Sequence, residues 1–235
     1  MLLALFNNLT EKDKSDAVEN LIENSTPNKD FFLMIILSVL MATFGLLINS
    51  PAVIIGSMLI APILHPILSL ALGIIISDTR LIYRSFYTVL KSLAYGIAAA
   101  ALVTVFFSYE GYSLTEEILA RTEPSLAYAG IAIIAGLAAS FALVKPKMSE
   151  ALPGIAISVA LIPPLAVTGI GIAKFDWGII SSSFILFIIN SVGIIFSSMI
   201  VFSLMNLYVK RKVAETTIIK EDRKMEREEK KEMLT

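Results

Sequence analysis

Residues 51–62 read PAVIIGSMLIAP, and residues 153–164 read PGIAISVALIPP. The two segments begin 102 residues apart (153 minus 51), are identical at five of twelve positions, and keep their first and last prolines in register. Proline lacks a backbone N–H, and its ring collides with the carbonyl one turn earlier, so it breaks a helix interior. An apolar segment that repeats together with its prolines therefore predicts two helices that are broken at matched positions.

The residues around both segments are strongly apolar. Hydrophobic residues make up 56% of the 235-residue chain, charged residues make up 17%, and the mean hydropathy is +0.79. Several uncharged runs exceed the ~20 residues that a helix needs to cross a bilayer core of about 30 Å. A soluble domain of this size could not bury so much apolar surface. We therefore expect an all-α, polytopic membrane protein of the cell membrane.

Six apolar runs predict six transmembrane helices, at residues 31–48, 51–76, 81–107, 126–144, 153–173 and 177–209. The second and fifth contain the proline segments, so we expect both to be broken. Residues 1–30 precede them as a polar segment with a short amphipathic helix, in which Thr10 and Asp13 form a capping pair. Residues 210–235 follow as a charged helix, since 12 of the 13 residues from 220 to 232 are charged.

The repeat predicts two units of three spans, at about residues 31–109 and 126–209. An odd number of spans places consecutive units in opposite orientations, which is the 3+3 inverted repeat of many secondary transporters. In a six-span topology, 17 of the 19 Lys and Arg residues fall on the face that holds both termini. Because cytoplasmic flanks are enriched in basic residues, we expect the N- and C-termini to be cytoplasmic. Lys91 lies within the third span, and we expect its side chain to snorkel toward that face.

Three motifs carry a family resemblance. They are NSPAVIIGSMLIAPIL at residues 49–64, EILARTEP at 117–124 and LPGIAISVALIPPLA at 152–166. In this order they resemble the DUF389 family of uncharacterised hydrophobic bacterial and archaeal membrane proteins, over about residues 30–205. The resemblance implies a membrane protein and brings no established activity to carry over.

The broken helices also supply the candidate functional site. A proline leaves a carbonyl without its helical donor, and in hydrocarbon that carbonyl needs another partner, a water or an ion. One interpretation is a cavity lined by carbonyls near residues 57–61 and 159–162, and the alternative is a kink repaired by neighbouring hydroxyls. The candidate residues of a substrate or ion pathway are Ser57, Pro62, His65, Ser158, Pro163, Pro164 and Asn190.

Two of these candidates have side chains with alternative roles. His65 is the only histidine, so it either responds to protons and contacts substrate or is a neutral imidazole bonded to a freed carbonyl. Asn190 either contributes to the same cavity or forms a hydrogen bond between helices.

Several chemistries lack their residues in this sequence. Cysteine is absent, all acidic residues lie in tails, loops or span ends, and there is no HExxH motif, phosphate-binding glycine loop or histidine cluster. We therefore expect no enzyme activity, no catalytic or metal-binding residues and no cofactor. The expected partners are the lipid bilayer, a small solute or ion, and further copies of the chain in a homo-oligomer. The formal net charge of -1 gives no indication of nucleic-acid binding.

Two functions from different classes fit this sequence. The first is a transporter or channel for a small solute or ion, with its site near the membrane midplane at the paired broken helices. The alternative is a non-transporting scaffold or sensor that recruits a cytoplasmic partner through the charged tail.

Overall fold

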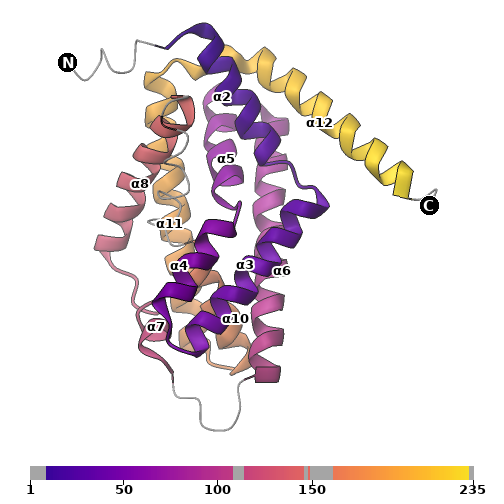
Figure 1. Ribbon diagram of the computed structural model, residues 1–235. Helices are drawn as coiled ribbons and strands as arrows, with labels where there is room; N and C mark the ends of the chain where they lie inside the picture. Colours follow the sequence, from indigo (N-terminus) through magenta and orange to yellow (C-terminus); the bar gives the residue numbers. More distant parts are fainter. Residues whose placement is uncertain (1–8, 108–113, 146–147, 149–160, 233–235) are drawn as a thin grey trace.

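The computed structural model describes residues 9–107, 114–145, 148 and 161–232, and throughout these residues the regular structure is helical (Figure 1). The all-α prediction is therefore confirmed for the described part of the chain. Long helices run along the length of the molecule, while α2 and α12 lie across one end, which is drawn at the top of Figure 1.

The N-terminal helix α2 (Glu11–Asn24) begins at the predicted capping pair. The Thr10 hydroxyl accepts from the Asp13 backbone N–H at 3.1 Å, and the Asp13 carboxylate accepts from the Thr10 backbone N–H at 3.0 Å. Hydrogen bonds from the hydroxyl and the backbone N–H of Thr10 hold the pKa of the Asp13 carboxyl below its ordinary value. One face of α2 is buried, at Ala17, Val18, Leu21 and Ile22.

Helix α3 (Lys29–Leu47) leads through a tight turn into a bent pair of helices, α4 (Pro51–Ile60) and α5 (Leu64–Ile76). Pro51 lies in the first turn of α4, where its missing N–H has no intrahelical role. The axes of α4 and α5 differ by 50°, and the chain is interrupted at residues 61–63. The predicted break in this span is therefore confirmed.

Helix α6 (Thr79–Phe107) returns along the molecule, and α7 (Glu116–Leu119) and α8 (Leu126–Val144) follow. The short helix α7 is capped by Thr115, whose hydroxyl accepts from the Ile118 N–H and also donates to the Leu46 carbonyl at 2.8 Å. The second bond attaches α7 to the end of α3.

The C-terminal elements are α10 (Ile162–Ala173), α11 (Trp177–Leu204), the 3₁₀ helix η2 (Leu207–Lys210) and α12 (Arg211–Glu232). Among the described helices, α3, α6, α8 and α11 are long and apolar enough to cross a membrane, and the bent pair α4–α5 makes a fifth candidate. The chain therefore has the helices of a membrane protein. Helix α10 has only 12 residues, and the earlier half of the fifth predicted span lies outside the described residues.

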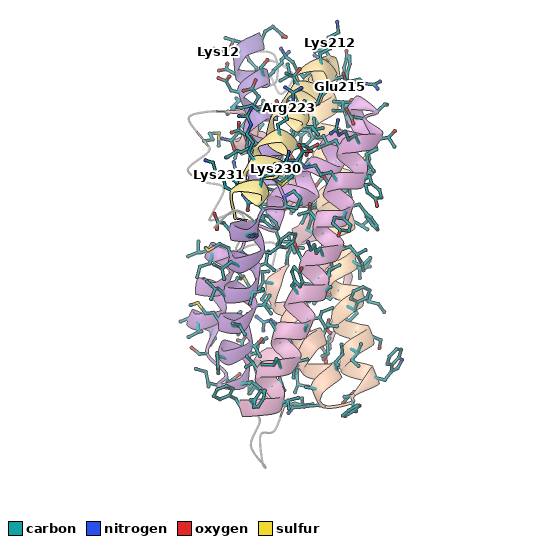
Figure 2. The ribbon with its side chains drawn as sticks, turned by 90° about the vertical axis from the view of Figure 1, so that its right-hand side faces the viewer. Lys12, Lys212, Glu215, Arg223, Lys230 and Lys231 are labelled. Carbon is teal, nitrogen blue, oxygen red and sulfur yellow. The ribbon has the colours of Figure 1, made fainter. Side chains whose placement is uncertain are left out.

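Charged side chains gather at the end formed by α2 and α12 (Figure 2). Arg84 of α6 pairs with Asp222 of α12 at 2.8 Å and donates to the Thr26 hydroxyl at 2.9 Å. Lys220 of α12 pairs with Glu23 of α2 at 3.1 Å. Lys210 of η2 pairs with Glu11 of α2 at 2.8 Å. The pairs of Lys220 and of Arg84 hold α12 against the N-terminal helix and a long apolar helix, and the pair of Lys210 holds η2 against the N-terminal helix.

Small residues allow α8 and α11 to pack closely. A Cβ added to Gly136 would lie 2.8 Å from the Ile194 Cα, closer than real Cβ atoms approach. Gly130, six residues earlier on α8, has nothing within 4 Å of the same added atom. The two glycines therefore have different roles, although the sequence presents them alike.

We expect Gly136→Ala to lower the free energy of unfolding by about 1–3 kcal/mol, because the methyl group forces α8 and α11 apart. The matched variant Gly130→Ala should raise it by up to about 1 kcal/mol through helix propensity alone. Unfolding in mixed detergent micelles measures both values. Equal effects of the two substitutions would contradict the assigned α8–α11 contact.

Candidate functional site

Three helix ends meet inside the described part of the molecule. The C-terminus of α4, the N-terminus of α5 and the N-terminus of α10 surround a cavity of about 10 Å³. A cavity of this size accommodates one water molecule. Its lining comes from both proline-containing regions and consists of Met58, Ala61, Ile63, Leu64, Leu161 and Ile162.

The cavity lies well inside the apolar part of the protein. At 1.5 Å per residue, α4 rises about 15 Å from its start to the break, and α5 rises about 20 Å from the break to its end. The break therefore divides this bent span into two parts of similar length. A bilayer core of about 30 Å that is centred on the span would have the cavity near its midplane.

One carbonyl at the break is satisfied by a hydroxyl from a neighbouring helix. The Ser57 carbonyl in the last turn of α4 accepts from the Ser38 hydroxyl of α3 at 2.7 Å, and both residues are fully buried. The Ser57 hydroxyl donates to the Ile54 carbonyl of its own helix at 2.6 Å. At Ser57, the structure thus supports repair by a neighbouring hydroxyl.

The prolines themselves lie at helix starts. Pro163 and Pro164 occupy the first turn of α10, and Pro66 is the third residue of α5. The first four amides of a helix have no intrahelical acceptor, so proline costs no hydrogen bond there. Pro62 lies in the interruption itself, and its carbonyl accepts from the His65 backbone N–H at 3.2 Å.

The extended backbone at Ala61 explains where α4 ends. Its φ of −74° and ψ of 120° lie in the region favoured by a residue that precedes proline. Pro62 thus terminates α4 through its neighbour as well as through its missing N–H.

Of the remaining candidates, His65 lies in the first turn of α5. The His65 Nδ1 is buried and has no hydrogen-bond partner among the described residues. Asn190 is 2% exposed on α11, which packs against both α5 and α10. Ser158 lies outside the described residues.

Four of the six lining residues fall within the stretches 57–61 and 159–162, where the sequence suggested a cavity lined by carbonyls, but none of the six was among the candidate residues. All six are apolar or small, and none has a functional group that would have marked it. Their only signal is that they adjoin the prolines, since Ala61 and Ile63 flank Pro62 and Ile162 precedes Pro163. The described residues contain no group of histidine, aspartate or glutamate side chains able to hold a metal ion.

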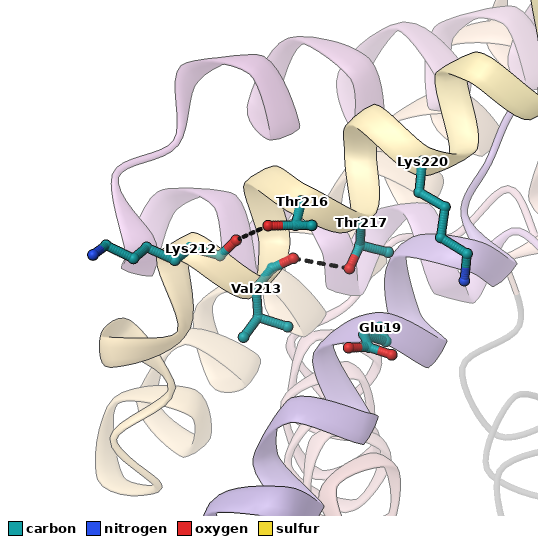
Figure 3. Close-up of a pocket in the computed structure, with 6 residues that line it drawn as sticks. All are labelled: Glu19, Lys212, Val213, Thr216, Thr217 and Lys220. Carbon is teal, nitrogen blue, oxygen red and sulfur yellow. Dashed lines mark hydrogen bonds between the residues drawn. The ribbon is translucent and has the colours of Figure 1, made fainter.

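A larger hollow of about 340 Å³ lies at the charged end, between α2 and α12 (Figure 3). Its residues are Glu19, Lys212, Val213, Thr216, Thr217 and Lys220. The Thr216 and Thr217 hydroxyls donate to the Lys212 and Val213 carbonyls of their own helix, and Lys220 pairs with Glu23. Because these donors are already engaged and the hollow lies away from the broken helices, it is not part of the candidate pathway.

Comparison with protein families gives one match that covers most of the chain. The sequence model described as "Domain of unknown function (DUF389)" matches residues 58–196. The chain belongs to the DUF389 family. The DUF389 match begins in α4 and ends in α11, so it includes the interruption at 61–63 and the start of α10 and excludes α2 and α12.

A curated relative of this DUF389 protein is the uncharacterized protein MJ0678 of Methanocaldococcus jannaschii, which is 32% identical over 208 residues. The alignment covers 83% of this chain and 63% of that relative, so the chain spans less than two thirds of the relative's length. No solved structure matches the DUF389 chain.

We expect Ser38→Ala to destabilise the protein by about 1–2 kcal/mol, because it removes the side-chain donor to the Ser57 carbonyl at the end of α4. The matched control is Ser92→Ala. Ser92 is equally buried, but its hydroxyl donates at 2.7 Å to Thr88, four residues earlier in the same helix, where the regular backbone bond remains. The stability of the two variants is compared by their unfolding midpoints in detergent. If Ser92→Ala lowered the midpoint as much as Ser38→Ala, the assigned role of the Ser38 hydroxyl would be contradicted.

Proposed function

We propose that this membrane protein is a transporter or channel for a small solute or ion, with its site where the ends of α4, α5 and α10 meet. The observation that carries the proposal is the cavity lined jointly by residues 58–64 and 161–162. Irregular backbone at membrane depth is tolerated only where it is buried in protein or lines a water-filled cavity. Paired discontinuous helices near the midplane are a common way of building a transport site.

The helix ends give this proposed site its polarity. The N-termini of α5 and α10 carry partial positive charge, and the C-terminus of α4 carries partial negative charge. The lining side chains are apolar, so the groups available to a polar solute are backbone amides and carbonyls, together with His65 in the first turn of α5. Since the cavity accommodates a single water molecule, passage of a larger solute requires these helix ends to separate.

We further propose six crossings arranged as an inverted repeat, with both termini in the cytoplasm. Helix α10 would be the second half of the fifth crossing, as α5 is the second half of the second. Two contacts at the end opposite α2 and α12 support this arrangement: the Thr115 hydroxyl donates to the Leu46 carbonyl, and the Glu117 N–H donates to the Asn49 side chain at 3.2 Å. The basic side chains at the opposite end support a cytoplasmic location for that end.

This topology predicts that reporters at residues 49–50, 115 and 175 are extracytoplasmic, and that reporters at 79, 147 and 235 are cytoplasmic. Cysteine is absent from the chain, so single cysteines introduced at these positions provide clean labelling sites. Accessibility to a membrane-impermeant thiol reagent in intact cells distinguishes the two faces. A cysteine at residue 115 that the reagent labels only after the cells are permeabilised would exclude the six-crossing arrangement.

The transport proposal predicts that Pro62→Ala abolishes most of the flux. Alanine at 62 releases Ala61 from its extended conformation and favours helix by about 3 kcal/mol, so α4 can extend across the gap. The double variant Pro62→Ala, Pro164→Ala should lose at least as much flux. The single variant His65→Ala tests the contribution of the imidazole to flux separately. Flux is measured after reconstitution into liposomes with a panel of monovalent ions and small anions.

Pro51→Ala is the matched control, because Pro51 lies in the first turn of α4 and breaks no helix. It should leave flux unchanged. Wild-type flux that survives Pro62→Ala would overturn the proposed site.

The scaffold or sensor alternative draws support from α12. Its first half docks on α2 and α6, while the charged residues that follow Asp222 are largely exposed and the helix extends away from the body (Figure 1). Deleting residues 220–235 separates the two functions. A transporter keeps its flux after the deletion, whereas a scaffold loses its cytoplasmic partner.

A further inference from the structure

Three aromatic rings surround the ammonium group of Lys91. Its Nζ lies 4.8 Å from the ring centre of Phe32 on α3, and 5.8 and 5.7 Å from those of Tyr87 and Tyr95 on α6. Phe32 and Tyr95 contact each other edge to face across the two helices at 5.3 Å. The cluster thus joins α3 to α6 and holds the cation in one place. We call these four residues the Lys91 cluster.

Lys91 lacks an acidic partner among the described residues. Its recorded contacts are the three rings, and no carboxylate in the described part of the chain lies within ion-pair distance of it. Arg80 and Arg84, earlier on the same helix, both pair with Asp222. The nearest charges on α3 are Lys29 and Asp30 at its start, one of each sign. An ammonium group has three donors, and aromatic faces satisfy none of them with an oxygen acceptor.

The depth of Lys91 follows from the exposed aromatic residues of α6. Tyr87 is 48% exposed and Phe107 is 58% exposed, and twenty residues of helix between them span about 30 Å, the thickness of a bilayer core. Aromatic side chains concentrate at the two membrane interfaces. Lys91 is one turn inside the Tyr87 level, about 6 Å. An ammonium at that depth snorkels toward the headgroup phosphates.

The surface around the Lys91 cluster suits a lipid. Leu33 and Leu37 of α3 and Leu90 of α6 are about half exposed, and α3 packs against α6. Such apolar surface at membrane depth is covered by acyl chains. The Tyr87 and Tyr95 side chains are also partly exposed, and phenolic hydroxyls can donate to phosphate.

We propose that the Lys91 cluster is a binding site for the headgroup phosphate of an anionic phospholipid. The Lys91 ammonium donates to the phosphate oxygens, the tyrosine hydroxyls add donors, and the three rings hold the side chain in place. An anionic headgroup is preferred because a zwitterionic one brings its own ammonium, which competes for the same phosphate. The proposal is independent of whether the protein transports a solute.

Native mass spectrometry of the full chain in neutral detergent tests this site, with phosphatidylglycerol and phosphatidylcholine added in separate titrations. The wild type should bind one phosphatidylglycerol about fivefold more tightly than phosphatidylcholine, the contribution of one basic side chain near an anionic surface. Lys91→Gln should remove that preference, and Lys91→Arg should keep it. Lys212→Gln is the matched control, because Lys212 is exposed on α12 and its side chain extends away from Glu19 and Lys220 (Figure 3).

Phe32→Leu provides a second test that retains the cation. It should weaken the preference without abolishing it, since the ammonium loses one of the three rings that position it. The proposal is overturned if the wild type binds both lipids equally, or if Lys91→Gln keeps the wild-type preference. A loss in Lys212→Gln equal to that in Lys91→Gln would also overturn it, because the preference would then reflect overall charge.

Discussion

The structure depends on one constraint: backbone polar groups inside a bilayer must be satisfied within the protein. The long apolar helices meet this constraint through their own hydrogen bonds. Their buried hydroxyls largely do the same, as Thr43, Ser92 and Thr104 each donate to a carbonyl four residues earlier. The interruption at residues 61–63 is where this solution fails, and there Ser38 of α3 supplies a donor to the end of α4. The position of the candidate site follows from that failure.

The bilayer also determines where the charged side chains lie. Ionised groups are costly in hydrocarbon, so the ion pairs of the described residues that hold α12 lie at the end where the helices leave the apolar region. Arg84 illustrates how such a charge is accommodated. Its side chain is only 11% exposed, pairs with Asp222 of α12 and donates to the hydroxyl of Thr26, which follows α2. A partly buried charge needs such partners, and removing one leaves the other without compensation. Lys91, about two turns further along α6 than Arg84, has aromatic rings around its ammonium group in place of a carboxylate.

Much of the fold could be predicted because it rests on local patterns. The capping pair of α2, the buried face of that helix and the break after α4 are encoded by residues within a few positions of one another. The candidate site was only partly predictable. Prolines marked where helices end, but the lining at Met58 and Leu161 depends on which ends meet, and those residues are 103 positions apart (161 minus 58).

By itself, the sequence determined that this is an apolar, all-helical membrane protein of the DUF389 family with an interrupted helix at Pro62, because hydropathy and proline geometry act over short stretches of chain. Only the tertiary structure decided that the first turn of α10 faces that interruption, that Ser38 repairs Ser57, and that Phe32 joins two tyrosines around Lys91. The physical reason is that these contacts join segments distant in sequence. Their strength depends on distances of a few ångströms, which composition and spacing do not encode.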